Sequence, residues 1–185
     1  MKRLNLYPIT EVDNLAWPEE MAGLTMASPA LRFFTDFTKV KPLVIDSTLS
    51  AVEVKRLMQQ THVRLKFVLN DAGQFIGIVS LDDLIDRKIV QKVSEGNRRD
   101  DIALTELMTP KRDLKALDYQ EVSKASILEV VRTLKDSGEQ HCLVVDLDDH
   151  KIRGIFSASD ISRKLHLPID IQDKSSFYKV FSTTA

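Results

Sequence analysis

From Gly77 to Asp83 the sequence reads Gly-Ile-Val-Ser-Leu-Asp-Asp, and from Gly154 to Asp160 it reads Gly-Ile-Phe-Ser-Ala-Ser-Asp. Both segments share the pattern Gly-apolar-apolar-Ser-x-x-Asp. Each follows a β-rich apolar run and precedes apolar residues at helical spacing, so each serine is expected at a strand-to-helix turn. The chain therefore contains one supersecondary unit twice, and this repeat decides the fold.

A serine and an aspartate at such a turn can bind a ligand or simply cap the helix. Unpaired N–H groups and the helix dipole favour a phosphate there, and the aspartate can accept both hydroxyls of a ribose. In the structural alternative, a capping box, the serine caps the helix and the acidic residue returns a hydrogen bond. A single copy favours the capping box. Because Ser80 and Asp83 recur as Ser157 and Asp160, the repeat favours a ligand-binding role.

A single offset relates the two copies, because 154 minus 77 gives 77 positions. Apolar positions upstream also coincide at this offset, and the alignment needs no gap. The coinciding pairs are Val54 with Val131, Leu57 with Leu134, and Phe67 with Val144. The sequence therefore predicts a mixed α/β (α+β) fold of two β-α-β-β-α units, each covering an apolar face of the other.

The apolar spacing also predicts the individual elements. In the first unit we expect strands at 43–45, 65–69 and 74–79, a helix starting near 46–48, and a motif helix from Ser80 to Val90. In the second unit we expect strands at 114–117, 141–145 and 151–156, a helix ending near Gly138, and a motif helix from Ser157 to Leu165. The expected segments are a leader (1–35), a first unit (36–95), a second unit (104–166) and a tail (167–185).

Composition excludes several classes of protein. The net charge of −1, with 26 basic and 27 acidic residues, argues against a nucleic-acid partner. No run approaches about 20 apolar residues, which argues against a membrane span, and the N-terminus lacks the apolar region of a signal peptide. The lone Cys142 cannot form an internal disulfide, and free cysteines are usually buried. We therefore expect a cytoplasmic protein.

The paired motifs, the order of elements and the segment Leu107-Met108-Thr109-Pro110 resemble two tandem CBS domains, a Bateman module. The resemblance covers residues from about 36 to 166, and Phe37-Thr38-Lys39 weakly echoes Met108-Thr109-Pro110 in the first unit. It implies pseudo-two-fold packing and clefts for an adenine nucleotide such as AMP, ADP or ATP, with no metal required. It also implies a stand-alone regulatory module that acts on an unknown effector protein or through self-association.

The resemblance further implies roles for individual residues. Asp83 and Asp160 would hold ribose hydroxyls, and Ser80 and Ser157 would approach the ribose or phosphate. The base would lie near residues 63–65 and 140–142 and near Thr38 and Thr109. The family often has proline where Phe67 and Leu143 or Val144 stand here, so the strands beside the base are expected to differ. The residues expected to contact a ligand are Ser157, Asp160, Ser80, Asp83, His141, Thr109, Val63, Lys164 and Arg87.

The two predicted sites differ in charge. Asp82 places a second carboxylate beside Asp83 and should disfavour a polyphosphate, whereas Ser159 stands at the matching place in the second motif. Cations near the second motif in sequence are Arg153, His141, Arg163 and Lys164. We therefore expect the second site to hold a charged nucleotide. Arg87 and Lys164 are either phosphate ligands or i,i+4 helix partners of the motif aspartates.

Two other classes of function compete with a ligand sensor. The four histidines are scattered and show no catalytic or metal-ligand spacing, which argues against an enzyme. A purely structural dimerisation module with degenerate clefts is compatible with the sequence. We expect a homodimer formed by the two motif helices, because Leu84, Ile85, Ile89, Ile161 and Leu165 exceed what two small sheets can cover.

Overall fold

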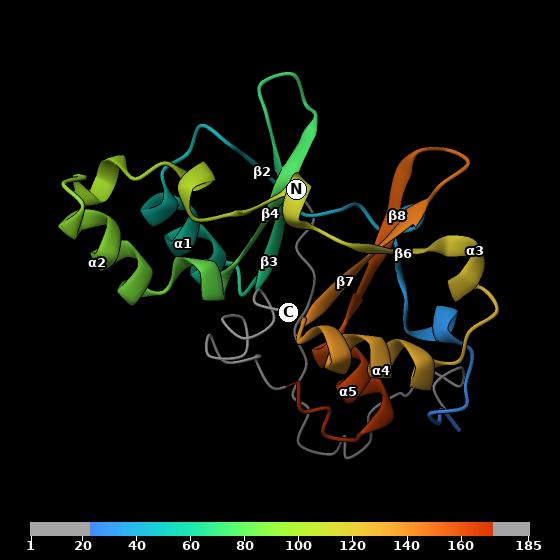
Figure 1. Cartoon of the computed structure of the whole chain (residues 1–185). Helices are drawn as coiled ribbons and strands as arrows, with labels where there is room; N and C mark the ends of the chain where they lie inside the picture. Colours follow the sequence, from blue (N-terminus) through green and yellow to red (C-terminus); the bar gives the residue numbers. More distant parts are fainter. Residues whose placement is uncertain (1–22, 172–185) are drawn as a thin grey trace, which may run out of the picture.

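The computed structural model describes residues 23–171, which form two four-stranded sheets with helices packed against them (Figure 1). The predicted fold class, a mixed α/β fold of two related units, is confirmed. One sheet has the order β2-β3-β4-β5 and the other the order β1-β8-β7-β6. The predicted leader and tail lie largely outside the described residues.

The first unit contains β2 (Val44–Asp46), α1 (Ala51–Gln60), β3 (Leu65–Leu69) and β4 (Phe75–Ser80). The Ser50 side chain caps α1 by accepting a hydrogen bond from the Glu53 N–H, so the helix starts later than predicted. Strand β2 runs parallel to β3, and β3 and β4 form the predicted antiparallel hairpin. Ile45 of β2, Val68 of β3 and Val79 of β4 are buried in one apolar cluster with α1.

The predicted continuous helix from Ser80 to Val90 is wrong. The chain forms a single 3-10 turn, η3 (Leu81–Leu84), then an extended residue, Ile85, and then α2 (Asp86–Ser94). Leu84 and Ile89 are both fully buried. On one regular helix, residues five positions apart point about 140° apart and could not share a core face. The break at Ile85 brings both side chains to the core.

The second unit contains β6 (Ala116–Asp118), α3 (Tyr119–Val122), α4 (Ile127–Ser137), β7 (His141–Asp146), β8 (Lys151–Ser157) and α5 (Ala158–Leu165). Helix α4 ends, as predicted, at Gly138, whose φ of 72° is left-handed. Helix α5 is continuous from the motif onward, unlike its counterpart in the first unit. The second motif helix is therefore confirmed.

Two short strands, each at the entry to one unit, pair with the sheet of the other unit and are called the exchanged strands. Strand β1 (Thr35–Asp36), which precedes the first unit, pairs with β8 of the second unit. Strand β5 (Thr109–Pro110), which precedes the second unit, pairs with β4 of the first unit. The motif glycines permit this pairing, since a Cβ on Gly77 would lie 2.4 Å from the Thr109 carbonyl oxygen, and one on Gly154 would lie 2.2 Å from that of Thr35.

The gapless alignment at an offset of 77 is also wrong outside the motif. Ser50 and Ser126 cap the equivalent helices α1 and α4, and 126 minus 50 gives 76. In the sheets, Val68 pairs with Gly77 and Val144 pairs with Gly154. The difference, 144 minus 68, is again 76. The hairpin turn of the second unit therefore contains one extra residue. The short helix α3 is a further insertion between β6 and α4.

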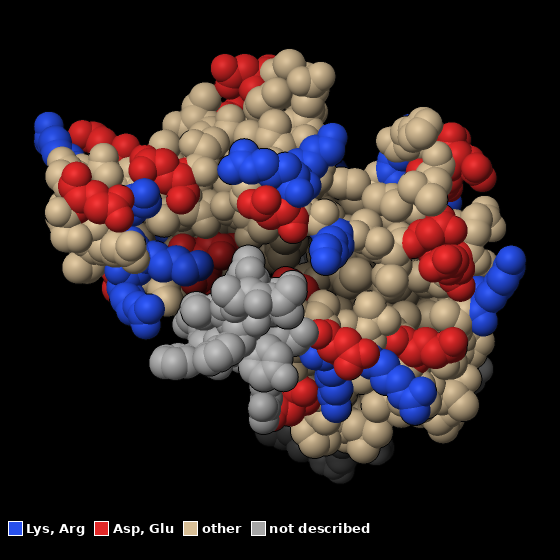
Figure 2. All heavy atoms as spheres, in the orientation of Figure 1, with Lys and Arg blue, Asp and Glu red and all other residues tan. Residues whose placement is uncertain are grey.

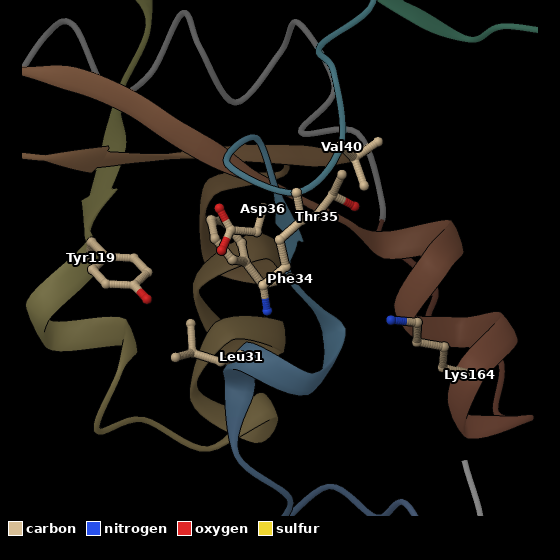
Figure 3. A pocket seen from close by; sticks show the side chains of 8 residues that line it. Leu31, Phe34, Thr35, Asp36, Val40, Tyr119 and Lys164 are labelled. Atoms are coloured by element: carbon tan, nitrogen blue, oxygen red, sulfur yellow. The ribbon is translucent and has the colours of Figure 1, made fainter. Parts of the chain in front are cut away.

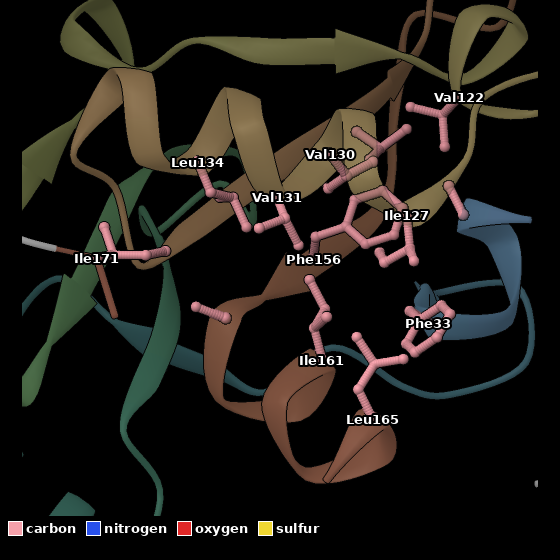
Figure 4. Close-up of a cluster of buried hydrophobic side chains, with 13 residues drawn as sticks. Phe33, Val122, Ile127, Val130, Val131, Leu134, Phe156, Ile161, Leu165 and Ile171 are labelled. Carbon is pink, nitrogen blue, oxygen red and sulfur yellow. The ribbon is translucent and has the colours of Figure 1, made fainter. Parts of the chain in front are cut away.

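Three apolar clusters hold the chain together. The first lies inside the first unit, and the second lies inside the second unit, where Phe33 and Ala30 of η2 (Ala30–Phe33) pack onto α4 and α5 (Figure 4). The third joins the two sheets through Phe67, Leu143 and Ile155. The Phe67 ring meets the Phe37 ring edge-on, with centroids 5.1 Å apart. Large apolar side chains therefore stand at positions where the resembled family often has proline.

These clusters overturn the argument given for a homodimer. Leu84, Ile89 and Ile161 are fully buried and Leu165 is 8% exposed, so the chain covers four of the five residues itself. Ile85 remains 43% exposed. In the described part of the chain, no helix is long and apolar enough to cross a membrane.

Candidate functional site

The two motifs lie where β4 and β8 end, each beside the start of the neighbouring strand. Ser80 pairs with Leu65 in the sheet register, and Ser157 pairs with His141. The residue after each serine donates its N–H to the segment before that strand, from Leu81 to the Arg64 carbonyl at 3.0 Å and from Ala158 to residue 140 at 2.9 Å. Residues 63–65 and 140–142 therefore lie next to the motif serines.

In the first motif the serine and the aspartate bind each other. Asp83 Oδ2 accepts hydrogen bonds from the Ser80 N–H at 2.9 Å and from its hydroxyl at 2.8 Å, and the Asp83 N–H donates to Ser80 Oγ at 3.2 Å. Asp83 Oδ1 accepts a hydrogen bond from Lys88 Nζ at 3.1 Å. Both carboxylate oxygens are thus engaged within the chain, and the first copy forms a capping box.

The second motif has no capping box. Ser157 makes no capping hydrogen bond, and its Oγ lies 2.8 Å from Ser159 Oγ. Asp160 forms an ion pair with Arg163, whose side chain is 74% exposed. An exposed ion pair contributes little and opens at low cost. The Asp160 carboxylate can therefore exchange its partner for a ligand more readily than the Asp83 carboxylate can.

His141 lies where charges of the two units meet. Burial lowers the pKa of His141, while the negative charge of Asp160 opposes that shift. Two residues of the first unit also act on this pKa, Arg64 lowering it and Asp82 raising it. The imidazole is therefore neutral near pH 7 and can donate one hydrogen bond and accept another. This is the chemistry needed to contact the edge of a nucleobase.

The exchanged strands place a threonine beside each motif. Thr109 of β5 pairs with Ile78, two residues before Ser80. Its counterpart is Thr35 of β1, which pairs with Ile155, two residues before Ser157. The prediction that Thr38 corresponds to Thr109 is wrong. Thr38 lies in the loop after β1, where its hydroxyl donates to Asp36 at 2.7 Å. Sequence reasoning missed Thr35, because its pairing with β8 joins residues far apart in the chain.

The predicted cations are less concentrated at the second motif than expected. Arg163 pairs with Asp160 there, and His141 is in register with Ser157. Arg153 instead pairs with Asp36, with distances of 3.0 and 3.2 Å between nitrogens and carboxylate oxygens. Lys164 Nζ donates to the Arg32 carbonyl at 2.9 Å. The second motif therefore holds fewer cations than the sequence indicated.

The i,i+4 pairing offered as the alternative for Arg87 and Lys164 is also wrong. Asp83 pairs with Lys88 rather than with Arg87, and Asp160 pairs with Arg163 rather than with Lys164. Because the first motif helix is broken at Ile85, the two cations do not occupy equivalent places. Val63 lies in the loop after α1, where its N–H donates to the Met58 carbonyl at 3.0 Å.

Two surface cavities border the second unit. They measure about 330 and 220 Å³, and neither is lined by a motif residue. Basic and acidic side chains are interspersed over the face seen in Figure 2. Within residues 23–171, no group of three or more His, Cys, Asp or Glu side chains could hold a metal ion. Burial raises the pKa of the Cys142 thiol to about 11, which makes it a poor nucleophile.

The family and structure comparisons agree with this arrangement. The CBS domain model matches residues 35–89 and 106–167. The chain is similar to an uncharacterized conserved protein from Pyrococcus horikoshii, with 27% identity and a TM-score of 0.58, over 80% of this chain and 98% of that one. No curated protein sequence matches the chain.

Two more distant structures share the fold. CBSX2 from Arabidopsis thaliana, solved in complex with AMP, has 22% identity and a TM-score of 0.52, over 74% of this chain and 94% of that one. A CBS domain protein from Streptococcus pneumoniae has 21% identity and a TM-score of 0.51, over 74% of this chain and 85% of that one.

Proposed function

Because this chain belongs to the CBS domain family, whose members are generally regulatory and non-catalytic, we propose that it is a sensor of an adenosine-containing ligand. The ligand binds beside the second motif, at the edge where the two units meet. Asp160 accepts the ribose hydroxyls, Ser157 lies against the ribose or phosphate, and His141 contacts the base. Thr35 borders the same site from the exchanged strand.

One observation carries this proposal, namely the difference between the two copies of the motif. Asp83 is held by three hydrogen bonds from Ser80 and Lys88, whereas the ion-pair partner of Asp160 among the described residues is the exposed Arg163. A ligand at the second motif displaces one surface ion pair, which costs about 0–1 kcal/mol. A ligand at the first motif must break a capping box, which costs about 0.5–2 kcal/mol before any contact is gained. The second site therefore binds more tightly.

The fold likeness to CBSX2 supports the choice of ligand class. That protein was solved in complex with AMP, and its chain shares the fold of this one. We propose AMP, ADP or ATP for this chain, with no metal required for binding.

The first cleft favours a second, structural role. The Asp83 carboxylate is already engaged in its own capping box, and Asp82 adds negative charge. This cleft therefore resembles a degenerate site. We propose that the first unit serves mainly to hold the second and to pair with another copy. The homodimer forms through the exposed apolar residues of α2, where Val90 is 55% and Val93 is 40% exposed.

The output of the module is a change in the relative orientation of the units, passed to an effector protein or to the dimer. Such a shift requires that the ligand bind one orientation more tightly than the other. The lone thiol of Cys142, which stays protonated, fits a reducing cytoplasm. Nothing in the described geometry requires a catalytic step.

Thermal denaturation with nucleotides tests the proposal. Ligand at 100 times its dissociation constant contributes about 2.7 kcal/mol, and a chain of this size shifts by about 2–4 °C per kcal/mol. The Tm should rise by about 5–11 °C with AMP, ADP or ATP, and clearly less with GMP or CMP. If no adenine nucleotide raises the Tm at millimolar concentration, the purely structural module is the better account.

A further inference from the structure

The cavity of about 330 Å³ shares Thr35 with the border of the proposed nucleotide site (Figure 3). Its lining comes from η2, β1 and the loop after β1, together with α3 and α5. No residue of 44–94 lines it, and neither do the motif residues Ser157 and Asp160. Its volume is within the range of small-molecule sites, about 300–1,000 Å³. The lining residues are Leu31, Phe34, Thr35, Asp36, Lys39, Val40, Tyr119 and Lys164.

One side of the cavity is a fixed aromatic wall. The Phe34 ring lies 6.1 Å from the Tyr119 ring and 5.3 Å from the Phe156 ring, centroid to centroid. The Arg153 guanidinium stacks on Tyr119, 4.4 Å from the ring centroid. Because the two hydrogen bonds to Asp36 hold Arg153 in place, the Tyr119 ring is held as well. A flat apolar body can pack on this wall without ordering it first.

Apart from the Asp36–Arg153 ion pair, the charged side chains at the cavity are positive. Asp36 is the single carboxylate among the lining residues, and its two oxygens are committed to Arg153. That pairing keeps the pKa of Asp36 well below its usual range, so the pair stays ionised and neutral overall. Lys39 and Lys164 also line the cavity, and Figure 3 shows Lys164 on α5 across from Tyr119. Their two ammonium groups attract an anion.

We infer that this cavity is a second ligand site, which takes a small organic carboxylate with a flat apolar body. The ring of the ligand packs on Phe34 and Tyr119, and its carboxylate faces the ammonium groups of Lys164 and Lys39. A carboxylate suits two separated lysines because each ammonium supplies a charge-assisted hydrogen bond. The two sites share Thr35 at their border but no motif residue, so a carboxylate on the aromatic wall need not contact the residues assigned to the ribose.

Benzoate titrated into the isotope-labelled full chain tests this inference by NMR. Saturable amide shifts should cluster at residues 31–40 and around Tyr119 and Lys164, with a dissociation constant on the order of 1 mM. Benzamide, the neutral analogue, should bind at least about fivefold more weakly. An excess of AMP should leave the benzoate affinity unchanged. Absence of saturable shifts at about 10 mM, equal binding of benzamide, or displacement by AMP would overturn the inference.

Three variants sharpen the test. Lys164→Gln keeps a donor for the Arg32 carbonyl but removes the charge, and should weaken benzoate about fivefold. Lys135→Gln removes the same charge from the exposed side of α4 and should leave the affinity unchanged. Leu31→Trp should fill the cavity and abolish benzoate binding. Equal effects of the two lysine substitutions, or wild-type benzoate affinity in a folded Leu31→Trp chain, would contradict the site.

Discussion

Alanine at Asp83 should destabilise the chain, because this carboxylate has a structural role. Its side chain is only 18% exposed and accepts hydrogen bonds from the Ser80 N–H, the Ser80 hydroxyl and Lys88. Loss of a helix cap costs about 0.5–2 kcal/mol. At about 2–4 °C per kcal/mol, the Tm of the ligand-free protein should fall by about 1–8 °C. AMP binding should change little.

Alanine at Asp160 should reduce the affinity for AMP strongly and the stability of the ligand-free chain only slightly. The partner that it loses in the ligand-free chain is the exposed Arg163, so the stability should fall by no more than about 1 kcal/mol. In the nucleotide complex the same substitution removes the acceptor of the ribose hydroxyls. A hydrogen bond to a charged acceptor is worth about 1.5–3 kcal/mol, so affinity for AMP should fall at least tenfold.

Calorimetric titration with AMP and thermal denaturation of both variants separate the two roles. Asp82→Ala is the matched control for Asp83, because it removes an exposed carboxylate from the same turn. Asp136→Ala, on the exposed side of α4, is the control for Asp160. The reasoning is refuted if Asp160→Ala binds AMP with wild-type affinity, or if Asp83→Ala is no less stable than Asp82→Ala.

Three further predictions follow from other contacts. Asp36→Asn should lower the free energy of unfolding by about 1.5–3 kcal/mol at pH 7, as measured by chemical denaturation. Because pairing with Arg153 lowers the pKa of Asp36, the extra stability of the wild type over this variant should be lost as the pH falls below about 4. Gly154→Ala should cost at least about 1–3 kcal/mol, because its Cβ would meet a β1 carbonyl oxygen at 2.2 Å. A Val90→Glu/Val93→Glu double variant should be monomeric at micromolar concentration by light scattering, whereas the parent chain should be a dimer.

Each of these predictions has its own control. Asp71→Asn, in the exposed hairpin turn, should leave the pH dependence of stability as in the parent chain. Gly73→Ala meets no atom within 4 Å and should cost only about 1 kcal/mol for its left-handed φ of 72°. Leu147→Glu, at the exposed tip of the other hairpin, should not dissociate the dimer. A monomeric parent chain, a pH-independent Asp36 effect or a harmless Gly154→Ala would each contradict the corresponding argument.

Local sequence signals were sufficient for the two units themselves. The strand at 65–69 and the C-terminal end of α4 at Gly138 follow from alternation and from a glycine cap, which depend on neighbours a few residues away. The motif pattern located both strand-to-helix turns for the same reason. The continuous helix predicted after Ser80 failed because the core, and not local propensity, sets the direction of Leu84 and Ile89.

The amino-acid sequence alone determined that one unit is built twice and where Ser157 and Asp160 stand in it. It could not determine that β1 completes the sheet of the second unit, since that pairing joins residues more than a hundred positions apart. For the same reason the sequence hid Thr35 at the motif and the cavity behind it. It also could not show that Asp83 is held by a capping box while Asp160 is not. The same Ser-x-x-Asp pattern begins a short 3-10 turn in the first unit and a continuous α-helix in the second, and the core sets this difference by burying both Leu84 and Ile89.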